Sequence, residues 1–463
     1  MEVSTNQAHE TGLGSGFSVV MVEKVLSTAR LKGIDDLWKD LQLGNPTKRV
    51  TSYSPRERIM AVLAGLACGM KGIASGNTVL RTNSAVVELC GGRFADQGTI
   101  HRWLGGVTPQ QAIELRKHLR QVARHHGEFW KELRSERRLI LDIDGQGVIA
   151  RGRGHEEAQW GYLGNGVDRG YQRYVIYSGK TREVLDESIR PGNTNLMGEL
   201  PALLAGLDDI FVDPQWREQV VIRLDAHGGT AGNLHAMQTA GYHYLTRMQC
   251  YAGVKRLKKK VVGTPGETFE APDSTGRVHR VEYWDVPAWT FRGRRGHAVT
   301  TRAILLHELN PDGQDFWWVL LTDLTEAVAK LWDEYHQRGG TIEEYNDQSE
   351  EAYHLKGIRT GNIHGLGALY ALVGLCWNLT AWATEDLELP PKIAPHADPY
   401  RWVPARDMSL AEILERASHC GLILNRQPHA RQLEVEDTIQ TKESRRWMVW
   451  LNQPIQQRFS LAA

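Results

Sequence analysis

Between Leu139 and Met248 the chain alternates apolar runs of strand length with segments of helical periodicity. The runs LILDIDG and VVIRLDAHGG each have the length of a strand and end in glycine. The segment NLMGELPALLAGLDDI, which lies between them, has the apolar spacing of a helix. Strands that alternate with helices are typical of an α/β layer structure, so this part of the chain is predicted to form an α/β core.

The texture of the sequence changes four times, which predicts five regions. Helical periodicity dominates before the core. A block rich in Gly, Thr and Arg, with short alternating runs, interrupts the core. A buried strand and two helices follow that block, and a proline-bearing loop ends the core. The predicted regions are a helical N-terminal region (1–137), a first part of the core (138–250), a β-rich insertion (251–315), a second part of the core (316–388) and a C-terminal helical region (389–463).

The composition is that of a globular chain with 41% hydrophobic and 24% charged residues, which excludes a disordered or collagen-like protein. Lys and Arg total 55, as do Asp and Glu, so any basic surface for an anionic partner must be local. The five cysteines are widely separated and form no CxxC pair, which disfavours a disulfide framework and a structural zinc site. The polar N-terminus lacks a signal-peptide pattern. We therefore expect a cytoplasmic protein.

One stretch is apolar enough to be considered as a membrane span. Residues 365–383 carry no charge, and about 20 apolar residues suffice to cross a bilayer. The stretch is solitary and contains Asn378, Thr380 and several glycines. These features favour a buried core helix over a span, and no membrane partner is expected.

Two aspartates end apolar strands of the predicted core. Period-2 alternation places Asp142 and Asp144 on one face of the first strand, and Asp144 stands just before a glycine. Asp225 ends the second strand in the same way. Either residue alone could cap a helix or shape a turn. As a pair, carboxylates after strongly apolar strands require donors or a cation, and oxygen ligands of this type suit Mg²⁺ or Mn²⁺.

A third carboxylate lies in the segment YHQRGGTIEEYNDQSEEAYHLK. Thr341 is predicted to be the N-cap of a helix, with Glu344 completing a Thr-x-x-Glu capping box. Glu343 then remains near the helix N-terminus without a local task, where the helix dipole favours its ionised form. The alternative is that Glu343 belongs to a solvated acidic helix face.

These segments together resemble the DDE-type transposases of bacterial insertion sequences that have a Tyr-x-x-Arg…Glu signature and an RNase H-like core with a β-rich insertion. The resemblance covers roughly residues 139–383. It implies that Asp144, Asp225 and Glu343 are the catalytic, metal-binding triad, with Tyr335 and Arg338 as signature residues near the DNA. The long interval between the second aspartate and the glutamate is what an insertion there would produce.

The resemblance also implies the partners and the chemistry. Two divalent cations, Mg²⁺ or Mn²⁺, would be bridged by Asp144, with the other two acids each completing the shell of one ion. The DNA partners would be the terminal inverted repeats of the element and the target DNA, bound by a homodimer in a synaptic complex, with the protein associated with the nucleoid. The N-terminal region would bind DNA, and the C-terminal region is a candidate for dimerisation.

Local basic stretches are the candidates for contacts with DNA phosphates, which position DNA without reading its sequence. They are RKHLRQVARHH and KELRSERR in the N-terminal region, a pair at Arg445 and Arg446, and four residues of the insertion, Arg256, Lys258, Lys259 and Lys260. Each stretch could equally be a solvated face. The segment ADQGTIHRWLGG fits a helix-turn-helix or ordinary helix packing. Trp289 could stack on an unpaired base, although packing in the protein core is the expected role.

Three alternatives remain open. The resembled family usually has Lys seven residues after the catalytic Glu, and this chain has Glu350 there, which suits a catalytically inactive or domesticated DNA-binding protein. Asp142 is a rival to Asp144 as the metal ligand. A glycosidase could use these two aspartates, since residues i and i+2 of a strand are about 6.6 Å apart, near the lower bound for an inverting pair. The sequence shows no sugar cleft, which disfavours the glycosidase.

Overall fold

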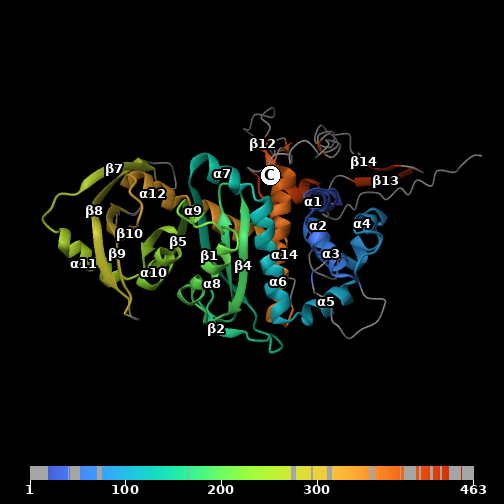
Figure 1. Cartoon of the computed structure of the whole chain (residues 1–463), viewed down its shortest axis with the longest axis horizontal. Helices are drawn as coiled ribbons and strands as arrows, with labels where there is room; N and C mark the ends of the chain where they lie inside the picture. Colours follow the sequence, from blue (N-terminus) through green and yellow to red (C-terminus); the bar gives the residue numbers. More distant parts are fainter. Residues whose placement is uncertain are drawn as a thin grey trace, which may run out of the picture. The chain divides into compact units, whose positions relative to one another are not determined.

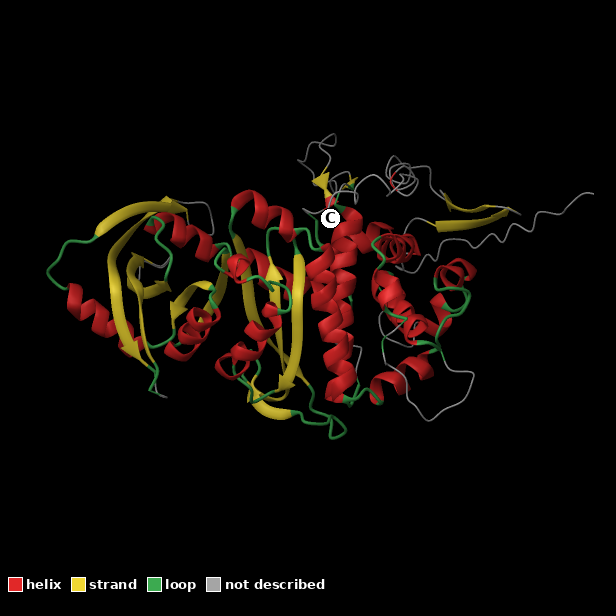
Figure 2. Ribbon diagram, viewed as in Figure 1, coloured by secondary structure: helices red, strands yellow, loops and turns green. Residues whose placement is uncertain are grey.

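The computed structural model describes residues 19–39, 41, 53–69, 76–164, 166–272, 278–293, 296–309, 315–353, 355, 360–385, 387–389, 403–405, 408–417, 421–427, 430–436 and 450. The chain divides into two compact units. Unit 1 comprises Met1–Val122, Gly152–Glu157 and Tyr345–Ala463, and unit 2 comprises Ala123–Arg151 and Ala158–Glu344. Figure 2 shows that helices dominate the described part of unit 1 and strands that of unit 2.

Helices form the N-terminal part of unit 1, as the periodicity predicts. They are α1 (Val19–Leu31), α2 (Ile34–Leu37), α3 (Pro55–Ala67), the π-helix η1 (Gly76–Leu80), α4 (Ser84–Leu89), α5 (Gln97–Gly105) and α6 (Pro109–His126). Ser54 and Glu57 form a capping box at the start of α3, and Asp96 caps α5. The unit boundary lies inside α6, whereas the sequence predicts a boundary at residue 137, because the end of α6 packs with the core of unit 2.

The long apolar helix α14 (Ile363–Thr384) is the centre of unit 1. It contacts α1, α3 and α5, and Gly365 permits the close approach of α5, since a Cβ there would lie 1.9 Å from the Leu104 carbonyl oxygen. By length and composition α14 could cross a membrane, but 83% of its most apolar window is buried in the structure. This burial agrees with the predicted core helix.

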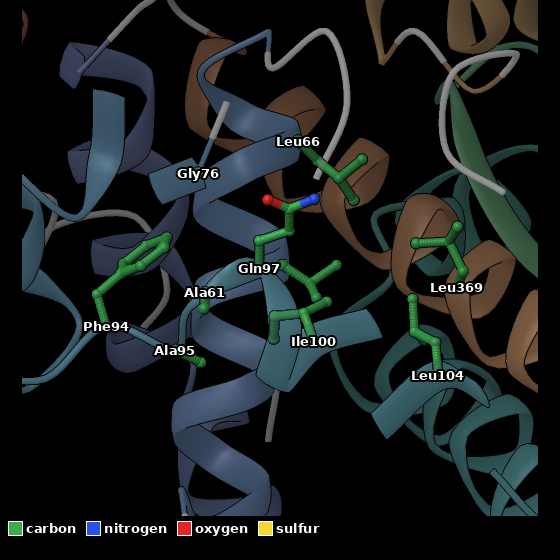
Figure 3. Close-up of a pocket in the computed structure, with 10 residues that line it drawn as sticks. Ala61, Leu66, Gly76, Phe94, Ala95, Gln97, Ile100, Leu104 and Leu369 are labelled. Atoms are coloured by element: carbon green, nitrogen blue, oxygen red, sulfur yellow. The ribbon is translucent and has the colours of Figure 1, made fainter. Parts of the chain in front are cut away.

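The same unit contains a small apolar pocket between α3, α5 and α14. Figure 3 shows Ala61 and Leu66 of α3, Ile100 of α5 and Leu369 of α14 around it. Gln97 is the polar side chain among the lining residues. The pocket is therefore part of the packing between these helices.

The C-terminal part of unit 1 is only partly helical. It contains α13 (Glu344–Ala352), which begins at the unit boundary, α15 (Leu410–Ala417), the short strands β11 (Glu388–Leu389) and β12 (Val403–Pro404), and the hairpin of β13 (Gly421–Gln427) and β14 (Ala430–Glu436). The sequence analysis predicts a helical region from residue 389. The hairpin differs from that prediction: GLIL is a short apolar run of strand length, and LEVE alternates apolar and polar residues with the period of a strand.

A large mixed sheet forms unit 2 (Figure 1), which confirms the predicted α/β class. The strand order is β2-β3-β1-β5-β6-β10-β9-β8-β7, and β4 also pairs with β3. Strands β1, β5 and β6 are parallel, and β3 is antiparallel to β1. The bounds are β1 (Leu139–Ile149), β2 (Gln159–Tyr162), β3 (Val167–Ser178), β4 (Glu183–Pro191), β5 (Val220–Gly229), β6 (His243–Met248), β7 (Glu267–Pro272), β8 (Val278–Arg292), β9 (Ala298–Leu309) and β10 (Asp315–Thr322).

The predicted β-rich insertion extends this sheet rather than forming a separate one. Strand β9 pairs with β10, and β8 and β7 follow outward in the same sheet. The block begins with a helix that the sequence analysis did not predict, α11 (Tyr251–Val261). Its apolar residues Val254, Leu257 and Val261 recur at helical spacing among basic residues, a signal that could have identified it.

Helices cover both faces of the sheet. On one face the apolar side chains of β1, Leu139, Leu141 and Ile143, pack with α7 (Phe129–Glu136), α8 (Leu196–Asp208), α10 (Ala231–Ala240) and α11. On the other face α12 (Val328–His336) packs on Val221 and Leu245. The short helix α9 (Pro214–Arg217) precedes β5, and the π-helix η2 (Gly339–Glu343) follows α12. The predicted alternation of β1 is thus confirmed.

A buried ion pair joins β3 to β4. The Arg173 Nη2 atom lies 2.7 Å from the Glu187 Oε1 atom, and both side chains are almost fully inaccessible to solvent. The Arg173 Nη1 atom also donates to the Gln146 Oε1 atom of β1. Removal of one partner from such a pair leaves an uncompensated buried charge.

We expect Arg173→Met to lower the free energy of unfolding by about 3–5 kcal/mol, because Glu187 would remain buried without its guanidinium partner. Urea denaturation followed by circular dichroism measures the change. The matched control is Arg151→Ala, which breaks the exposed pair with Asp168 and should cause no measurable change. Equal losses in the two variants would contradict the prediction.

A second ion pair predicts a pH dependence. The hydrogen bond from His243 Nδ1 to Asp323 Oδ2, 3.0 Å long, raises the pKa of His243 above its usual value. A raised pKa means that the protonated imidazole stabilises the folded state below about pH 6.5, and that this contribution is lost as the pH rises through the folded-state pKa. The thermal midpoint of His243→Gln should therefore fall further below that of the wild type at about pH 5.5 than at about pH 8.5. An equal deficit at both pH values would exclude this linkage.

Candidate active site

The first two predicted acids stand at neighbouring positions on the sheet. Strands β1 and β5 are parallel, with Asp142 opposite Arg223 and Ile143 opposite Leu224. Asp144 and Asp225 follow these residues by one position, and neighbouring strands are about 4.8 Å apart. The carboxyl ends of the two strands therefore bring both aspartates to one edge of the sheet, on the face that α12 covers.

The glycine turn after Asp225 is required by close packing. A Cβ at Gly229 would lie 1.8 Å from the Arg247 carbonyl oxygen, so no larger residue fits there. The Gly228 amide donates to the Asp225 Oδ1 atom at 3.2 Å, and the His227 Nδ1 atom lies 2.9 Å from the Oδ2 atom. These contacts orient the Asp225 carboxylate, which remains 32% exposed.

Asp142 lies one step further inside and has a different environment. Its carboxylate accepts two hydrogen bonds from Arg223, from Nε at 2.5 Å and from Nη2 at 2.8 Å, and both side chains are buried. The Thr341 hydroxyl donates to the Asp142 Oδ2 atom at 2.6 Å. Both carboxylate oxygens are thus engaged by protein donors, whereas Asp144 lies nearer the solvent.

The prediction that Thr341 caps a helix is wrong. Thr341 lies within η2, a π-helix whose preceding residue is Arg338, and no side chain caps its start. The Thr341 hydroxyl bonds Asp142 and the Arg338 carbonyl oxygen instead of a downstream amide. The buried acceptor on β1 competes successfully for the hydroxyl, so the capping-box pattern is present in the sequence but is not used with Glu344.

The π-helix sets the direction of Glu343. In an α-helix residues five apart lie about 140° apart around the axis, whereas the i→i+5 repeat of a π-turn places them on one face. Arg338 and Glu343 have this spacing, and the Arg338 Nη1 atom lies 3.3 Å from the Glu343 Oε1 atom. The other terminal nitrogen, Nη2, lies 2.6 Å from the Asp144 Oδ1 atom. Arg338 thus bridges two of the three predicted acids.

The electrostatics of the site reflect this crowding. Burial raises the pKa of Asp144 to about 6, Arg338 opposes the shift, and the charges of Asp225 and Glu343 add to it. Burial lowers the pKa of Arg338, but Asp144 and Asp225 outweigh that effect and raise the pKa overall. Asp144 and Glu343 therefore contact the guanidinium directly, and the charge of Asp225 acts on both Asp144 and Arg338.

The donor set suits a divalent cation, although Arg338 stands in its place. In the described part of the chain, no three His, Cys, Asp or Glu side chains lie close enough to hold a metal ion together. The groups that could hold one are the carboxylates of Asp144, Asp225 and Glu343, the last of which is 59% exposed. Two of them already bind a cationic group, and carboxylate oxygens are the ligands that Mg²⁺ and Mn²⁺ prefer.

The predicted signature tyrosine is a packing residue in this structure. The Tyr335 ring lies 5.5 Å from the Trp318 ring, and burial raises the pKa of its hydroxyl. Arg338 is almost fully buried and engaged with the acids. A contact between Arg338 and a DNA phosphate therefore requires that its present ion pairs open.

Helix α11 carries five basic residues, four of which are the predicted DNA contacts of the insertion. The Lys258 ammonium lies 3.7 Å from the centre of the Trp317 ring, and that of Lys260 lies 5.4 Å from the centre of the Trp289 ring. Arg256 and Lys259 are exposed. Trp289 packs against the core of unit 2, as expected for it. Of these four, Arg256, Lys259 and Lys260 are exposed and Lys258 is half-buried, and Lys258 and Lys260 also lie over tryptophan rings.

Two residues of the site were not identified from the sequence. Arg223 precedes Asp225 by two positions in β5, and period 2 places it on the same face as that acid. Thr341 precedes Glu343 by two positions. A buried arginine in an apolar strand requires an acidic partner, which was a usable signal, but the sequence does not tell which acid lies beside it.

No curated protein matches the sequence. A cryo-EM structure of a piggyBac transposase synaptic complex with hairpin DNA is similar over 87% of this chain and 80% of that chain, with 10% sequence identity and a TM-score of 0.40. The model of the family described as Transposase DDE domain group 1 matches residues 26–357, which include all the site residues described above. The chain belongs to this family of DDE transposases, as its resemblance to DDE-type transposases predicted.

Proposed function

We propose that the protein is the DNA transposase of a bacterial insertion sequence, which binds the ends of the element and catalyses strand cleavage and strand transfer. The observation that carries the proposal is the contact of the Arg338 guanidinium with Asp144 and Glu343, at the sheet edge where β1 and β5 bring Asp144 and Asp225 to neighbouring positions. Family membership supplies the reaction class, DNA cleavage and transfer. The geometry supports the assignment of these three acids to that reaction.

We assign the catalytic core to the strands that carry the acids and their neighbours, β4-β3-β1-β5-β6 with β10, and we propose that this core is RNase H-like. The support is the mixed topology, in which parallel β1, β5 and β6 end at one edge and antiparallel β3 completes the sheet. Ligands of open α/β sheets bind outside the carboxyl ends of the strands. The acids occupy that edge.

Two bound divalent cations would activate the attacking hydroxyl and stabilise the leaving oxygen of the phosphodiester. Asp144, Asp225 and Glu343 are the residues that we assign to hold these ions. The Gly228 amide and His227 orient the Asp225 carboxylate toward the site. Glu343, at 59%, is the most exposed of the three acids.

Arg338 has a role before DNA binds. Three carboxylates at close range repel one another, and the guanidinium balances two of them directly. We propose that this charge keeps the empty site folded, and that the guanidinium then turns to a DNA phosphate, as the resemblance implies. Arg256 and Lys259 of α11 are exposed insertion residues that we assign to phosphate contacts.

A second candidate function is favoured by one observation. Glu350 of α13 stands where the resembled family usually has Lys, so this chain lacks that cation. A transposase-derived protein that binds DNA without cutting it would fit this departure. Such a protein would retain affinity for element ends, would not nick DNA in Mn²⁺, and would be unaffected by substitution of the triad.

We expect Asp144→Asn, Asp225→Asn and Glu343→Gln each to abolish cutting of DNA that carries the element ends, because each change removes an anionic ligand without altering side-chain size. Binding of the same DNA should persist. Gel assays of cleavage in Mg²⁺ and of mobility shift measure the two properties. The matched control is Asp333→Asn, an exposed acid on the neighbouring helix α12, which should cut normally. Near-normal cutting by any triad variant would remove that residue from the proposed triad.

We expect Arg338→Met to bind Mn²⁺ more tightly than the wild type in the absence of DNA, yet to cut DNA more slowly. The variant loses the cation that competes for the Asp144 and Glu343 oxygens, and it also loses the phosphate contact. Since loss of Arg338 raises the pKa of Asp144 further, the measurement belongs at about pH 8, where the Asp144 carboxylate is ionised. Arg338→Lys keeps the charge and is the control. Weaker Mn²⁺ binding by Arg338→Met would oppose the proposed role.

A further inference from the structure

We propose that Thr341, held by the buried pair of Asp142 and Arg223, is a positioning residue that fixes the π-turn carrying Glu343 over the other two acids. This inference rests on the proposed function, because it assigns a role toward the same site. Asp142 and Arg223 are buried, Thr341 is half-buried, and the Thr341 hydroxyl contacts both of these side chains. We call the network of Asp142, Arg223 and Thr341 the β1–β5 clamp.

Arg223 holds both sides of the segment that carries the site residues. Its Nη1 atom donates to the Glu334 carbonyl oxygen near the end of α12, and its Nη2 atom lies 3.3 Å from the Thr341 hydroxyl in η2. Arg338 lies between these two anchor points in the sequence, and Glu343 follows two residues after the second. One guanidinium therefore ties both flanks of Arg338 to strand β5.

Asp142 fixes the guanidinium in turn. Its two oxygens accept from Arg223 in a bidentate arrangement, which restricts rotation of the planar group. The Thr341 hydroxyl completes the network by donating to the Asp142 Oδ2 atom at 2.6 Å, and its oxygen also lies 2.9 Å from the Arg338 carbonyl oxygen. Since protein donors engage both its oxygens, Asp142 acts through Thr341 rather than as a ligand of a metal ion.

Packing restricts the same turn from the other side. Gly179, just after β3, faces the Thr341 methyl group, and a Cβ added there would lie 2.4 Å from the Thr341 Cγ2 atom. The turn thus has no room to move toward β3 and is tied to β1 and β5 by hydrogen bonds. Polar partners behind a metal ligand commonly change metal affinity or activity by about 10–100-fold when they are lost.

The first test compares Thr341→Val with Thr341→Ser in the full-length protein. Valine keeps the branched shape and removes the hydroxyl, whereas serine keeps the hydroxyl and removes the methyl group. We expect Thr341→Val to weaken Mn²⁺ binding by about 10–100-fold and to raise the Mn²⁺ concentration needed for half-maximal DNA cutting, with Thr341→Ser close to the wild type. Electron paramagnetic resonance of unbound Mn²⁺ measures the affinity without any reaction.

A second variant displaces the turn without removing a polar group. Gly179→Ala places a methyl group against Thr341 and should also weaken Mn²⁺ binding, while binding of the element-end DNA stays at the wild-type level. Circular dichroism of each variant checks that the fold is retained. If Thr341→Val does not fold, Gly179→Ala decides the question alone.

The outcomes separate this inference from the proposed function. Wild-type affinity for Mn²⁺ in both Thr341→Val and Gly179→Ala overturns the inference, and the proposed function stands if Asp144→Asn still loses Mn²⁺ and cutting. Equal loss in Thr341→Ser and Thr341→Val overturns it as well, because packing and not the hydroxyl would then hold the turn. If the wild type neither binds Mn²⁺ nor cuts DNA, the proposed function falls and the inference falls with it.

Discussion

The bidentate pair between Asp142 and Arg223 is the interaction on which the site depends. Both charges are buried in strands that are otherwise apolar, and neither could be buried without the other. The pair therefore requires that β1 and β5 be neighbours in a register that sets these two residues opposite each other, as the structure has them. The same register brings the next residues on that face, Asp144 of β1 and Asp225 of β5, to neighbouring positions.

Exposure rises step by step from this pair to the solvent. The Asp142 side chain is inaccessible, whereas those of Asp144, Asp225 and Glu343 are 19%, 32% and 59% exposed. The buried Asp142 carboxylate can only be neutralised by protein groups. The three more exposed carboxylates can exchange a protein partner for another cation. An aspartate thus has a structural role at position 142, whereas the aspartate two residues further along the same face of β1, at position 144, is available for chemistry.

The sequence predicts the elements of this site better than their contacts. Period-2 alternation identifies the inner face of β1 and the acids at the strand ends, because side-chain direction in a strand is a local property. Which strand lies beside β1 is a tertiary property, so the partner of Asp142 was not identified. The π-turn was missed for a similar reason: the Thr-x-x-Glu pattern favours a cap locally, but the buried Asp142 accepts the Thr341 hydroxyl instead. The basic residues of α11 obscured a helix that its three apolar positions would have revealed.

Arg338 offsets the negative charge that the fold brings together at this site. Acids brought together by the fold raise one another's pKa and oppose burial, as Asp144 shows. The i→i+5 spacing of η2 places the Arg338 guanidinium beside Glu343. Its two terminal nitrogens form ion pairs with Asp144 and Glu343 at the same time. A lysine, with a single ammonium group, could not bridge both acids with the same planar geometry. The clamp that holds the π-turn and the arginine that the turn carries are therefore parts of one arrangement: the first fixes where Glu343 stands, and the second offsets the charge that its approach to Asp144 creates.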